Sequence, residues 1–366
     1  MAALDLHRKA PYRVTQAPRL SVVVPLRDVA PYLPTLLATL ARTERQDVEL
    51  LFVDDHSQDA TPDIAAAALG GFPLARLLHL DATTGLSAGR NRGLAEATAP
   101  VVTFLDGDDW IAPRYLDEAL ARFEERDVDV MRVDHTRVTG NRRDVVRNPI
   151  GVRGRPVDVR EHVLPVHRPS IVDFPTAWGG FYRRSFLLEH GLTFAEELLT
   201  AEDRDWWWRV LLSGGRVSFE DLNGYRYRRG VTTSLTQIGD ARQLHYFDSL
   251  ERSLVAVSAD REAERFLPKL WRGYLAILLS QHRRAARLLP AVRQEQARRN
   301  ADVLARVPRP LLHRILIQMS GSDVEVLRTL GLAVPDPEVL QLGKRRAPAD
   351  LVPDVDPDAG SGGAVR

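Results

Sequence analysis

Residues 101–110 read VVTFLDGDDW, an apolar run that ends in three carboxylates, Asp106, Asp108 and Asp109. The β-branched run predicts a buried strand. Three acids so close together repel one another unless a cation offsets their charge, and divalent Mg²⁺ or Mn²⁺ binds carboxylate and phosphate oxygens together. The stretch therefore predicts a strand end that holds a metal and a diphosphate, although DGDD by itself more often marks an acidic surface turn.

A second predicted strand ends in the same way, because residues 50–59 read LLFVDDHSQD, with Asp54 and Asp55 at the strand end. In open α/β sheets, ligands bind beyond the carboxyl ends of the strands, so Asp55 and the DGDD turn should face one crevice. A carboxylate there can accept hydrogen bonds from a base N–H or from ribose hydroxyls. For Ser57 and Asp59 we favour a structural role, as caps of the turn and of the following helix.

Short β-branched runs alternate with helical stretches from about residue 20 to 133, which is the pattern of a largely parallel sheet covered by helices. The predicted strands cover residues 20–25, 48–54, 75–80, 101–105 and 128–133. Farther along, the sequence predicts a hairpin around Gly140, a helix over 202–213, and two strands near 216–219 and 222–228.

A turn of small residues with paired arginines lies between the two acidic strand ends, where residues 84–93 read TGLSAGRNRG. The N-terminus of a helix, together with arginine, can hold phosphate oxygens. The turn lacks the lysine and serine of a P-loop, so on its own it indicates only a helix start that suits an anion.

The composition describes a globular chain without a dominant charge. Of the 366 residues 44% are hydrophobic, and 50 basic residues nearly cancel 49 acidic ones. This balance provides no general attraction to nucleic acid, and the lack of cysteine excludes disulfides and thiolate catalysis. The first residues carry charges where a signal peptide needs an apolar run, and no apolar run is long enough to span a membrane. We therefore expect a cytoplasmic protein that does not bind nucleic acid.

The order of several motifs along the chain resembles that of the family-2 glycosyltransferases of the GT-A fold. The matching segments are SVVVPLRDVAPYLPTLLATL (21–40), VDDHSQDAT (53–61), GLSAGRNRGL (85–94), FLDGDDW (104–110), WGGFYRRSFL (178–187), AED (201–203) and YRYRRGVTTSLT (225–236). The last segment is similar to one in transferases that build surface polysaccharides and teichoic acids. The resemblance implies an α/β fold, with a Rossmann-like GT-A domain that binds a nucleotide sugar and a helical C-terminal extension.

The resemblance also implies roles for residues on the donor side of the site. Pro25 and Asp55 would hold the nucleoside, and Arg90 the diphosphate. Asp106 and Asp108 would bind the ribose, the phosphates and the metal, Mn²⁺ or Mg²⁺.

Four further residues take roles at the reacting end of the donor by the same resemblance. Arg228 and Ser234 would support the leaving diphosphate from the other side. Asp203 would be the catalytic base, and Glu202 beside it would anchor the acceptor or support the start of the helix. Without the family, an acid pair at a helix start is explained equally well by the helix dipole.

The resemblance as a whole implies an inverting, metal-dependent glycosyltransferase of the hexosyl- or N-acetylhexosaminyltransferase type. It would move a sugar from a nucleotide diphosphate donor, a UDP-sugar by preference, to a hydroxyl of a cell-surface glycan or polyol-phosphate polymer. Thr83 stands where the family often has asparagine, which leaves the contacts to the base open. A sugar nucleotidyltransferase and a catalytically silent GT-A binding module are the alternatives.

We expect four parts along the chain: an N-terminal extension over 1–19, a GT-A domain over 20–239, a helical region over 240–332 and a disordered tail over 333–366. The helical region is rich in basic residues between 265 and 314, opposed within that stretch only by Glu295 and Asp302. Its basic residues are Arg265, Lys269, Arg272, Arg283, Arg284, Arg287, Arg293, Arg298, Arg299, Arg306, Arg309 and Arg314. They form either a solvated helical face or a surface for peripheral membrane contact or homo-oligomerisation.

Overall fold

The computed structural model describes residues 17–231, 235, 237–332 and 334, and these group into two compact units. The sheet unit contains the described residues up to His162 and those of Phe174–Gln237. The helical unit contains Val163–Asp173 and the described residues from Ile238 onward. The short segment Val163–Asp173 therefore groups with helices that follow it much later in the chain.

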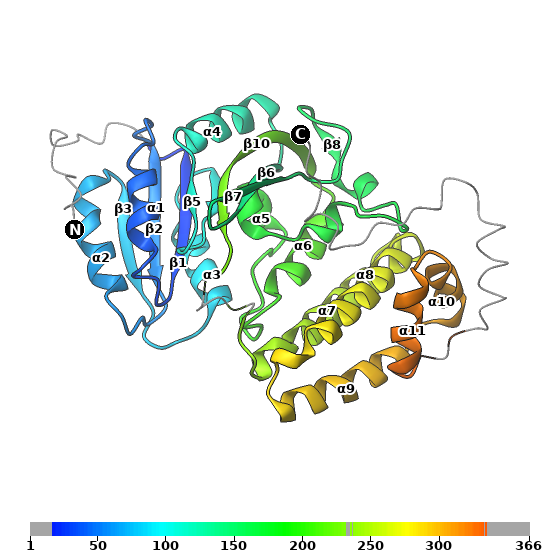
Figure 1. Ribbon diagram of the computed structural model, residues 1–366. Helices are drawn as coiled ribbons and strands as arrows, with labels where there is room; N and C mark the ends of the chain where they lie inside the picture. The colour runs from blue at the N-terminus through cyan, green and yellow to red at the C-terminus, as the bar shows by residue number, and fades with distance from the viewer. Residues whose placement is uncertain (1–16, 232–234, 236, 333, 335–366) are drawn as a thin grey trace. The chain divides into compact units, whose positions relative to one another are not determined.

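One mixed sheet forms the centre of the sheet unit, with the strand order β3-β2-β1-β4-β9-β6-β10-β5, while β7 pairs with β6 and β8 with β10 (Figure 1). The strands are β1 (Leu20–Leu26), β2 (Val48–Asp54), β3 (Ala75–His79), β4 (Val101–Phe104), β5 (Trp110–Ile111), β6 (Val130–Thr139), β7 (Arg142–Val146), β8 (Val157–Asp158), β9 (Gly180–Arg183) and β10 (Arg216–Arg228). The first four run parallel to one another, β9 runs antiparallel between β4 and β6, and β10 is parallel to β6.

The predicted parallel strands and the hairpin are confirmed, with differences at β6, β9 and β10. Strand β6 covers Val130–Thr139 rather than 128–133, and the antiparallel strand β9 was not predicted. Strands β1 to β4 lie within one or two residues of the predicted ranges, and β6 and β7 form the hairpin around Gly140. The two strands expected near 216–219 and 222–228 are instead one continuous strand, whose register against β6 shifts between Glu220 and Tyr225. An irregularity of this kind bends a strand without ending it.

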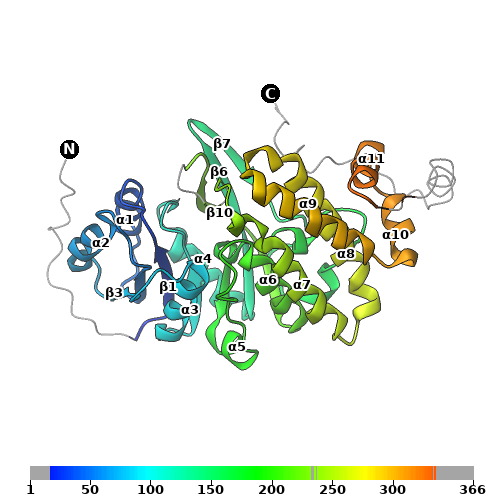
Figure 2. The ribbon, with the colours of Figure 1, turned by 90° about the horizontal axis from the view of Figure 1, so that it is seen from below.

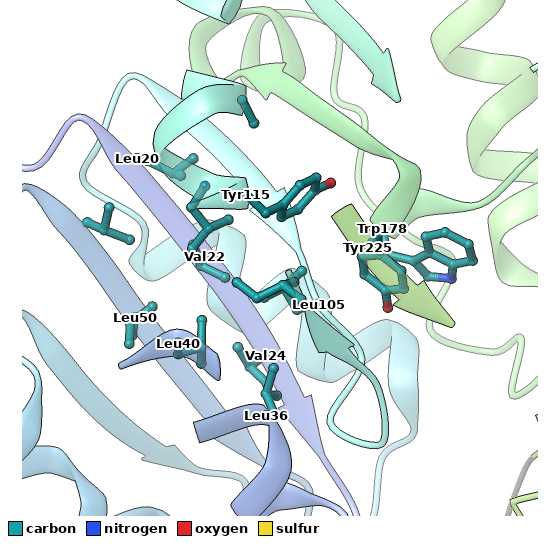
Figure 3. Close-up of a cluster of buried hydrophobic side chains, with 14 of the residues drawn as sticks. Leu20, Val22, Val24, Leu36, Leu40, Leu50, Leu105, Tyr115, Trp178 and Tyr225 are labelled. Carbon is teal, nitrogen blue, oxygen red and sulfur yellow. The ribbon is translucent and has the colours of Figure 1, made fainter. Parts of the chain in front are cut away.

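Helices cover the sheet on both faces. Those of the sheet unit are α1 (Leu33–Leu40), α2 (Thr61–Ala68), α3 (Leu86–Glu96), α4 (Tyr115–Arg126), α5 (Arg184–Glu189) and α6 (Glu202–Leu212). All seven residues of β1 are buried, as expected for a parallel strand with both faces covered. Leu20, Val22 and Val24 alternate on one face of β1, in one core cluster with Leu36 and Leu40 of α1 (Figure 3).

The opposite face of β1 meets α3 at very short range. A Cβ atom placed on Gly93 would lie 2.2 Å from Cγ1 of Val23, and one on Gly89 would lie 3.2 Å from Cβ of Pro25. Glycine at these positions therefore lets α3 lie directly on the strand. The close approach sets the position of the arginine-bearing helix relative to the carboxyl end of β1.

The helical unit is built around α8. Its helices are α7 (His245–Ser258), α8 (Ala263–Arg283), α9 (Pro290–Ala305), α10 (Arg309–Leu316) and α11 (Gly321–Thr329). Helix α8 contacts α7, α10 and α11, and it buries Phe266, Leu270, Tyr274 and Leu278 on one stripe. Among the helices of the described residues, none combines the length and the apolarity that a membrane crossing requires.

Candidate active site

The acidic turn follows β4 directly, as the sequence predicted. Leu105 donates its backbone N–H to Val23 of β1, and the chain then turns through Asp106–Asp109 before β5 begins. Asp106 and Asp108 are partly exposed, whereas Asp109 is buried. Burial, together with the neighbouring Asp106, raises the pKa of Asp108 to about 6. Ionisation of Asp108 in this turn is therefore unfavourable unless a positive charge is bound nearby.

Strand β10 fixes the shape of the acidic turn through Asp109. The Tyr225 hydroxyl donates a hydrogen bond of 2.6 Å to Oδ2 of Asp109, and the Arg228 backbone N–H donates one of 2.6 Å to Oδ1. The Tyr225 hydroxyl also accepts a 3.3 Å hydrogen bond from the backbone N–H of Asp106. Burial and the charges of Asp108 and Asp106 raise the pKa of Asp109 well above its usual range. The turn is thus held by contacts that join residues more than 110 positions apart in sequence.

Arg90 of α3 joins the acidic turn to the start of α6. Its Nη2 donates to Oδ1 of Asp106 at 2.9 Å, and its Nη1 donates to Oε1 of Glu202 at 2.7 Å. Only 2% of Arg90 is exposed, and the guanidinium lies 5.2 Å from the centre of the Phe194 ring. Burial lowers the pKa of Arg90, but the carboxylates of Asp106 and Glu202 outweigh burial and raise it. Arg90 is therefore a permanent cation between two acids.

Asp203 lies beside this ion pair in the first turn of α6 and is partly buried. Burial raises its pKa to about 7, with a further contribution from the charge of Glu202, while Arg204 and Arg90 act in the opposite direction. A carboxyl group with a pKa near neutrality can take up a proton and release it again at physiological pH. Such a perturbed group at the carboxyl-end edge of a parallel sheet is a candidate for acid–base chemistry.

Arg228 lies at the end of β10, against the same turn. Its guanidinium carbon is 4.4 Å from the ring centre of Trp110 and 5.1 Å from that of Tyr32, and its Nε donates to the backbone carbonyl of Asp108 at 2.6 Å. Its buried Nη2 has no hydrogen-bond acceptor within the described part of the chain. Ser234, expected to act with Arg228, lies outside the described residues.

Asp55 and Pro25 lie at adjacent strand ends, where the sequence placed them. One oxygen of Asp55 accepts hydrogen bonds from the backbone N–H and the hydroxyl of Thr84, at 2.6 and 3.1 Å, and the other accepts from the backbone N–H of Gly85 at 2.9 Å. The carboxylate therefore anchors the small-residue turn before α3. Direct contact of Asp55 and Pro25 with a nucleoside stays a prediction.

The structural roles favoured for Ser57 and Asp59 are confirmed. The Ser57 hydroxyl accepts a hydrogen bond from the backbone N–H of Asp28, and the Asp59 carboxylate accepts from the backbone N–H of Thr61 and of Ala30. Both side chains thus tie the start of α2 to the loop after β1.

Asp106 and Asp108 are suited to hold a divalent cation. Arg90 occupies one oxygen of Asp106, and the other oxygen accepts no hydrogen bond from the residues described. The raised pKa of Asp108 marks charge that a cation would offset. Within residues 17–231, 235, 237–332 and 334, no group of three or more His, Asp or Glu side chains is arranged to hold a metal. Magnesium usually needs only one or two protein carboxylates when a substrate supplies phosphate oxygens.

Sequence reasoning missed the residues that organise this site. Asp109 was grouped with Asp106 and Asp108 as an acid of the predicted metal site, and Tyr225 was given no role, although both stand inside the segments that resemble the family. Tyr225 is fully buried and stacks on Trp178 with ring centres 4.2 Å apart (Figure 3). A buried tyrosine needs a hydrogen-bond partner for its hydroxyl, and its two-residue spacing from Tyr227 placed both on one strand face. That spacing is the one local signal for Tyr225, and it does not name Asp109 as the partner.

The family model of glycosyl transferase family 2 matches residues 21–188, which span β1 to α5. The chain contains a family-2 glycosyltransferase domain. The predicted GT-A fold with a helical C-terminal region is confirmed by the likeness to solved structures. The family-2 domain carries Asp55, Arg90, Asp106 and Asp108, whereas Asp203 and Arg228 follow it along the chain.

Two relatives illustrate how far the likeness in sequence extends. The uncharacterized glycosyltransferase EpsJ of Bacillus subtilis is 26% identical over 224 residues, which are 60% of this chain and 64% of EpsJ. The poly(ribitol-phosphate) β-N-acetylglucosaminyltransferase TarS of Staphylococcus aureus is 27% identical over 214 residues, which are 57% of this chain and 35% of TarS. The matched region thus spans less than two thirds of either relative.

The structural likeness covers more of the chain. TarS residues 1–349 in complex with UDP-GlcNAc align with a TM-score of 0.64 and 19% identity, over 85% of this chain and 88% of the other. A mannosyltransferase from Pyrobaculum calidifontis, in complex with GDP-Man and Mn²⁺, aligns with a TM-score of 0.51 and 17% identity, over 91% and 87%. Identities this low establish a shared fold and leave substrates open.

Proposed function

We propose that this chain is an inverting, metal-dependent glycosyltransferase that moves a sugar from a nucleotide diphosphate sugar to a hydroxyl acceptor. The observation that carries the proposal is the partly buried Asp203, with a pKa raised to about 7, next to the Glu202–Arg90–Asp106 ion pairs. These contacts bring a candidate base and a candidate phosphate site together at one edge of the sheet. A surface acid at a helix start would have neither a raised pKa nor buried ionic neighbours.

In this proposal, ionised Asp203 accepts the proton of the acceptor hydroxyl. The hydroxyl oxygen then forms a bond to the anomeric carbon while the bond from that carbon to the diphosphate oxygen breaks, and the nucleoside diphosphate leaves. A single displacement of this kind inverts the anomeric centre and needs one base and no enzymic nucleophile. Glu202 would act indirectly, through the helix start and Arg90.

Asp106 and Asp108 would hold the divalent cation, Mn²⁺ or Mg²⁺. When bound, a divalent cation offsets the charge of the donor diphosphate and of the diphosphate that leaves. Arg228 contacts the rings of Trp110 and Tyr32, and its buried Nη2 lacks an acceptor among the described residues, so it would support the same diphosphate from the β10 side. The same role for Ser234 follows from the family resemblance alone.

One relative guides the choice of substrates to test. TarS is named for transfer of N-acetylglucosamine to poly(ribitol-phosphate), and its structure was obtained with UDP-GlcNAc. We propose a UDP-sugar as donor, with a hexosyl or N-acetylhexosaminyl group, and a glycan or polyol-phosphate polymer of the cell surface as acceptor.

A screen of nucleotide sugars for donor hydrolysis in the presence of Mn²⁺ tests the proposal. We expect hydrolysis of one donor class, a loss of hydrolysis on chelation of the cation, and inversion at the anomeric centre by NMR of the product. Incubation with a nucleoside triphosphate and a sugar 1-phosphate is the control for the nucleotidyltransferase alternative. Formation of a nucleotide sugar with release of pyrophosphate would replace the proposal with that alternative, and inactivity towards every substrate would favour a silent binding module.

A further inference from the structure

Both terminal nitrogens of Arg90 bind acids, and the residue has almost no exposed surface to offer a ligand. Its two terminal nitrogens bind Asp106 and Glu202, its Nε is buried without an acceptor in the described structure, and 2% of the residue is exposed. Phe194 lies against the guanidinium at 5.2 Å. A residue that recognises phosphate presents its N–H donors where phosphate oxygens can reach them, whereas Arg90 is buried behind the two acids that it binds. The contacts of Arg90 therefore suit another role better than that of a diphosphate ligand.

The two acids that bind Arg90 lie on elements that carry different parts of the proposed chemistry. Asp106 belongs to the acidic turn after β4, and Glu202 precedes the candidate base, Asp203, at the start of α6. Glu202 is 6% exposed, so its charge needs a buried partner, and Arg90 is the cation that provides one. Helix α3 holds Arg90 in place because Gly93 and Gly89 pack closely against β1.

We propose that Arg90 is a positioning residue that couples the acidic turn to the base-bearing helix, rather than a ligand of the donor diphosphate. The inference rests on the proposed function, because it assumes that the turn binds the donor and that α6 carries the base. Each arm of the bridge holds one carboxylate in place, so loss of either arm lets the start of α6 shift relative to the acidic turn. Such a shift impairs the chemical step more than the binding of the diphosphate.

The experiment compares binding of UDP and of uridine by calorimetry in the presence of Mn²⁺, together with kcat and KM for the donor that the hydrolysis screen identifies. Arg90→Lys keeps the charge but cannot reach both acids, and Glu202→Gln removes one arm while it leaves Arg90 in place. Arg92→Lys is the matched control, because Arg92 is two residues away on the same helix, 46% exposed at its side chain, and paired with Glu96 alone among the residues that the structure describes.

If Arg90 is a positioning residue, Arg90→Lys and Glu202→Gln keep the preference for UDP over uridine within about threefold of the wild-type value, since no phosphate contact is lost. Both variants then lose kcat by about 100-fold with little change in the KM for the donor. The double variant has about the same kcat as the less active of the two single variants, because the two changes break one bridge. Arg92→Lys behaves as wild type.

Two results would overturn the inference. One is a preference for UDP over uridine that falls about tenfold or more in Arg90→Lys alone, which is the loss expected for a direct charged hydrogen bond to phosphate. The other is an unchanged kcat in both variants, which would leave the ion pairs with a structural role only. A wild-type protein that binds UDP no better than uridine would instead contradict the proposed function, and the inference would fall with it.

Discussion

At the scale of single residues, Asp203 carries the proposed reaction. A hydroxyl attacks an anomeric carbon effectively only while it loses its proton to a well-placed base. Asparagine cannot take up that proton, so Asp203→Asn should keep its donor affinity and lose turnover by about 10²–10⁴-fold, the usual contribution of a positioned base. Steady-state kinetics with saturating acceptor, and calorimetry with UDP, measure the two quantities separately.

Near-normal turnover of Asp203→Asn would remove Asp203 from the mechanism and restore the nucleotidyltransferase alternative. Trp208→Phe is a suitable control for general disturbance of α6, because Trp208 is buried on the same helix and lies outside the proposed chemistry. It should affect stability more than the catalytic step.

The pH dependence of the reaction follows from the raised pKa of the same carboxyl. Because the pKa of Asp203 is about 7 rather than near its usual value of 3.8, the group is largely protonated below neutrality. A protonated carboxyl cannot act as the base, so kcat/KM should fall tenfold per pH unit as the pH drops below about 7 and level off above it. A pH–rate profile checks this, and a plateau that extends down to pH 5 would contradict it.

Asp108 should make nucleotide binding depend on a divalent cation. Its carboxylate and that of Asp106 repel the donor phosphates unless a cation lies between them. We expect chelation of the cation, or Asp108→Ala, to weaken UDP binding by at least about tenfold, whereas binding of uridine should change little. Calorimetry with both ligands measures this. Equal UDP affinity with and without the cation would contradict the proposal that a metal ion joins these carboxylates to the phosphates.

At the scale of structural elements, the packing of α3 on β1 positions the Arg90 bridge. Gly93→Ala places a methyl group where Val23 already lies, because the added Cβ would be 2.2 Å from Cγ1 of Val23. Overpacking of this kind typically costs about 1–3 kcal/mol. The free energy of unfolding in urea should fall accordingly, and turnover should fall as well because α3 moves away from the strand end.

The matched control is Gly70→Ala, since nothing lies within 4 Å of a Cβ placed at that exposed position of the same unit. Its free energy of unfolding should stay within about 0.5 kcal/mol of the wild-type value. Equal free energies of unfolding in Gly93→Ala and Gly70→Ala would show that β1 can shift to accept the added methyl group. The close packing of α3 on β1 would then not fix the position of the helix.

Strand β10 is the other element that organises the site. It runs beside β6, which separates it from β7 (Figure 2), and its end presents Tyr225 to Asp109 and Arg228 to Asp108. Two short strands, as the sequence predicted, would have left a loop between the outer part of the sheet and the acidic turn. Because the strand is continuous, its backbone pairing with β5 holds the acidic turn in a fixed position relative to the sheet.

At the scale of the whole molecule, ion pairs neutralise much of the basic helical region. Within the helical unit, Arg265 pairs with Glu262, Lys269 with Asp173, Arg283 with Asp323, Arg299 with Asp248, and Arg306 with Glu251. The exposed Arg284, Arg293, Arg309 and Arg314 have no side-chain partner among the described residues. If the region docks on an anionic surface, these four arginines should carry the attraction.

Replacement of these four arginines by glutamine in the full chain tests the docking hypothesis. We expect binding to vesicles with anionic lipid to weaken by roughly fivefold for each charge, since a basic residue near such a surface contributes about 1 kcal/mol. Arg298→Gln with Arg306→Gln is the control, because these arginines are already paired with acids. A wild-type protein that binds no vesicles and sediments as a monomer would contradict both membrane contact and homo-oligomerisation.

The sequence by itself determined the sheet and the placing of its acidic strand ends. Alternation of β-branched runs with helical stretches is a local pattern, and parallel strands bring their carboxyl ends to one edge without further information. For that reason the ranges of β1 to β4, the start of α6 and the positions of Asp55, Asp106 and Asp203 could be predicted. The motif order then predicted the family.

Only the tertiary structure decided how the charges pair. Arg90 lies 16 residues from Asp106 and 112 from Glu202, and no local pattern reports that all three meet. In the same way, the basic residues between 265 and 314 faced two acids within that stretch of sequence, yet Asp173, Asp248, Glu251 and Asp323 reach them in the folded helical unit. Coulomb attraction depends on distance in space, and distance in space between residues far apart in the chain is set by packing.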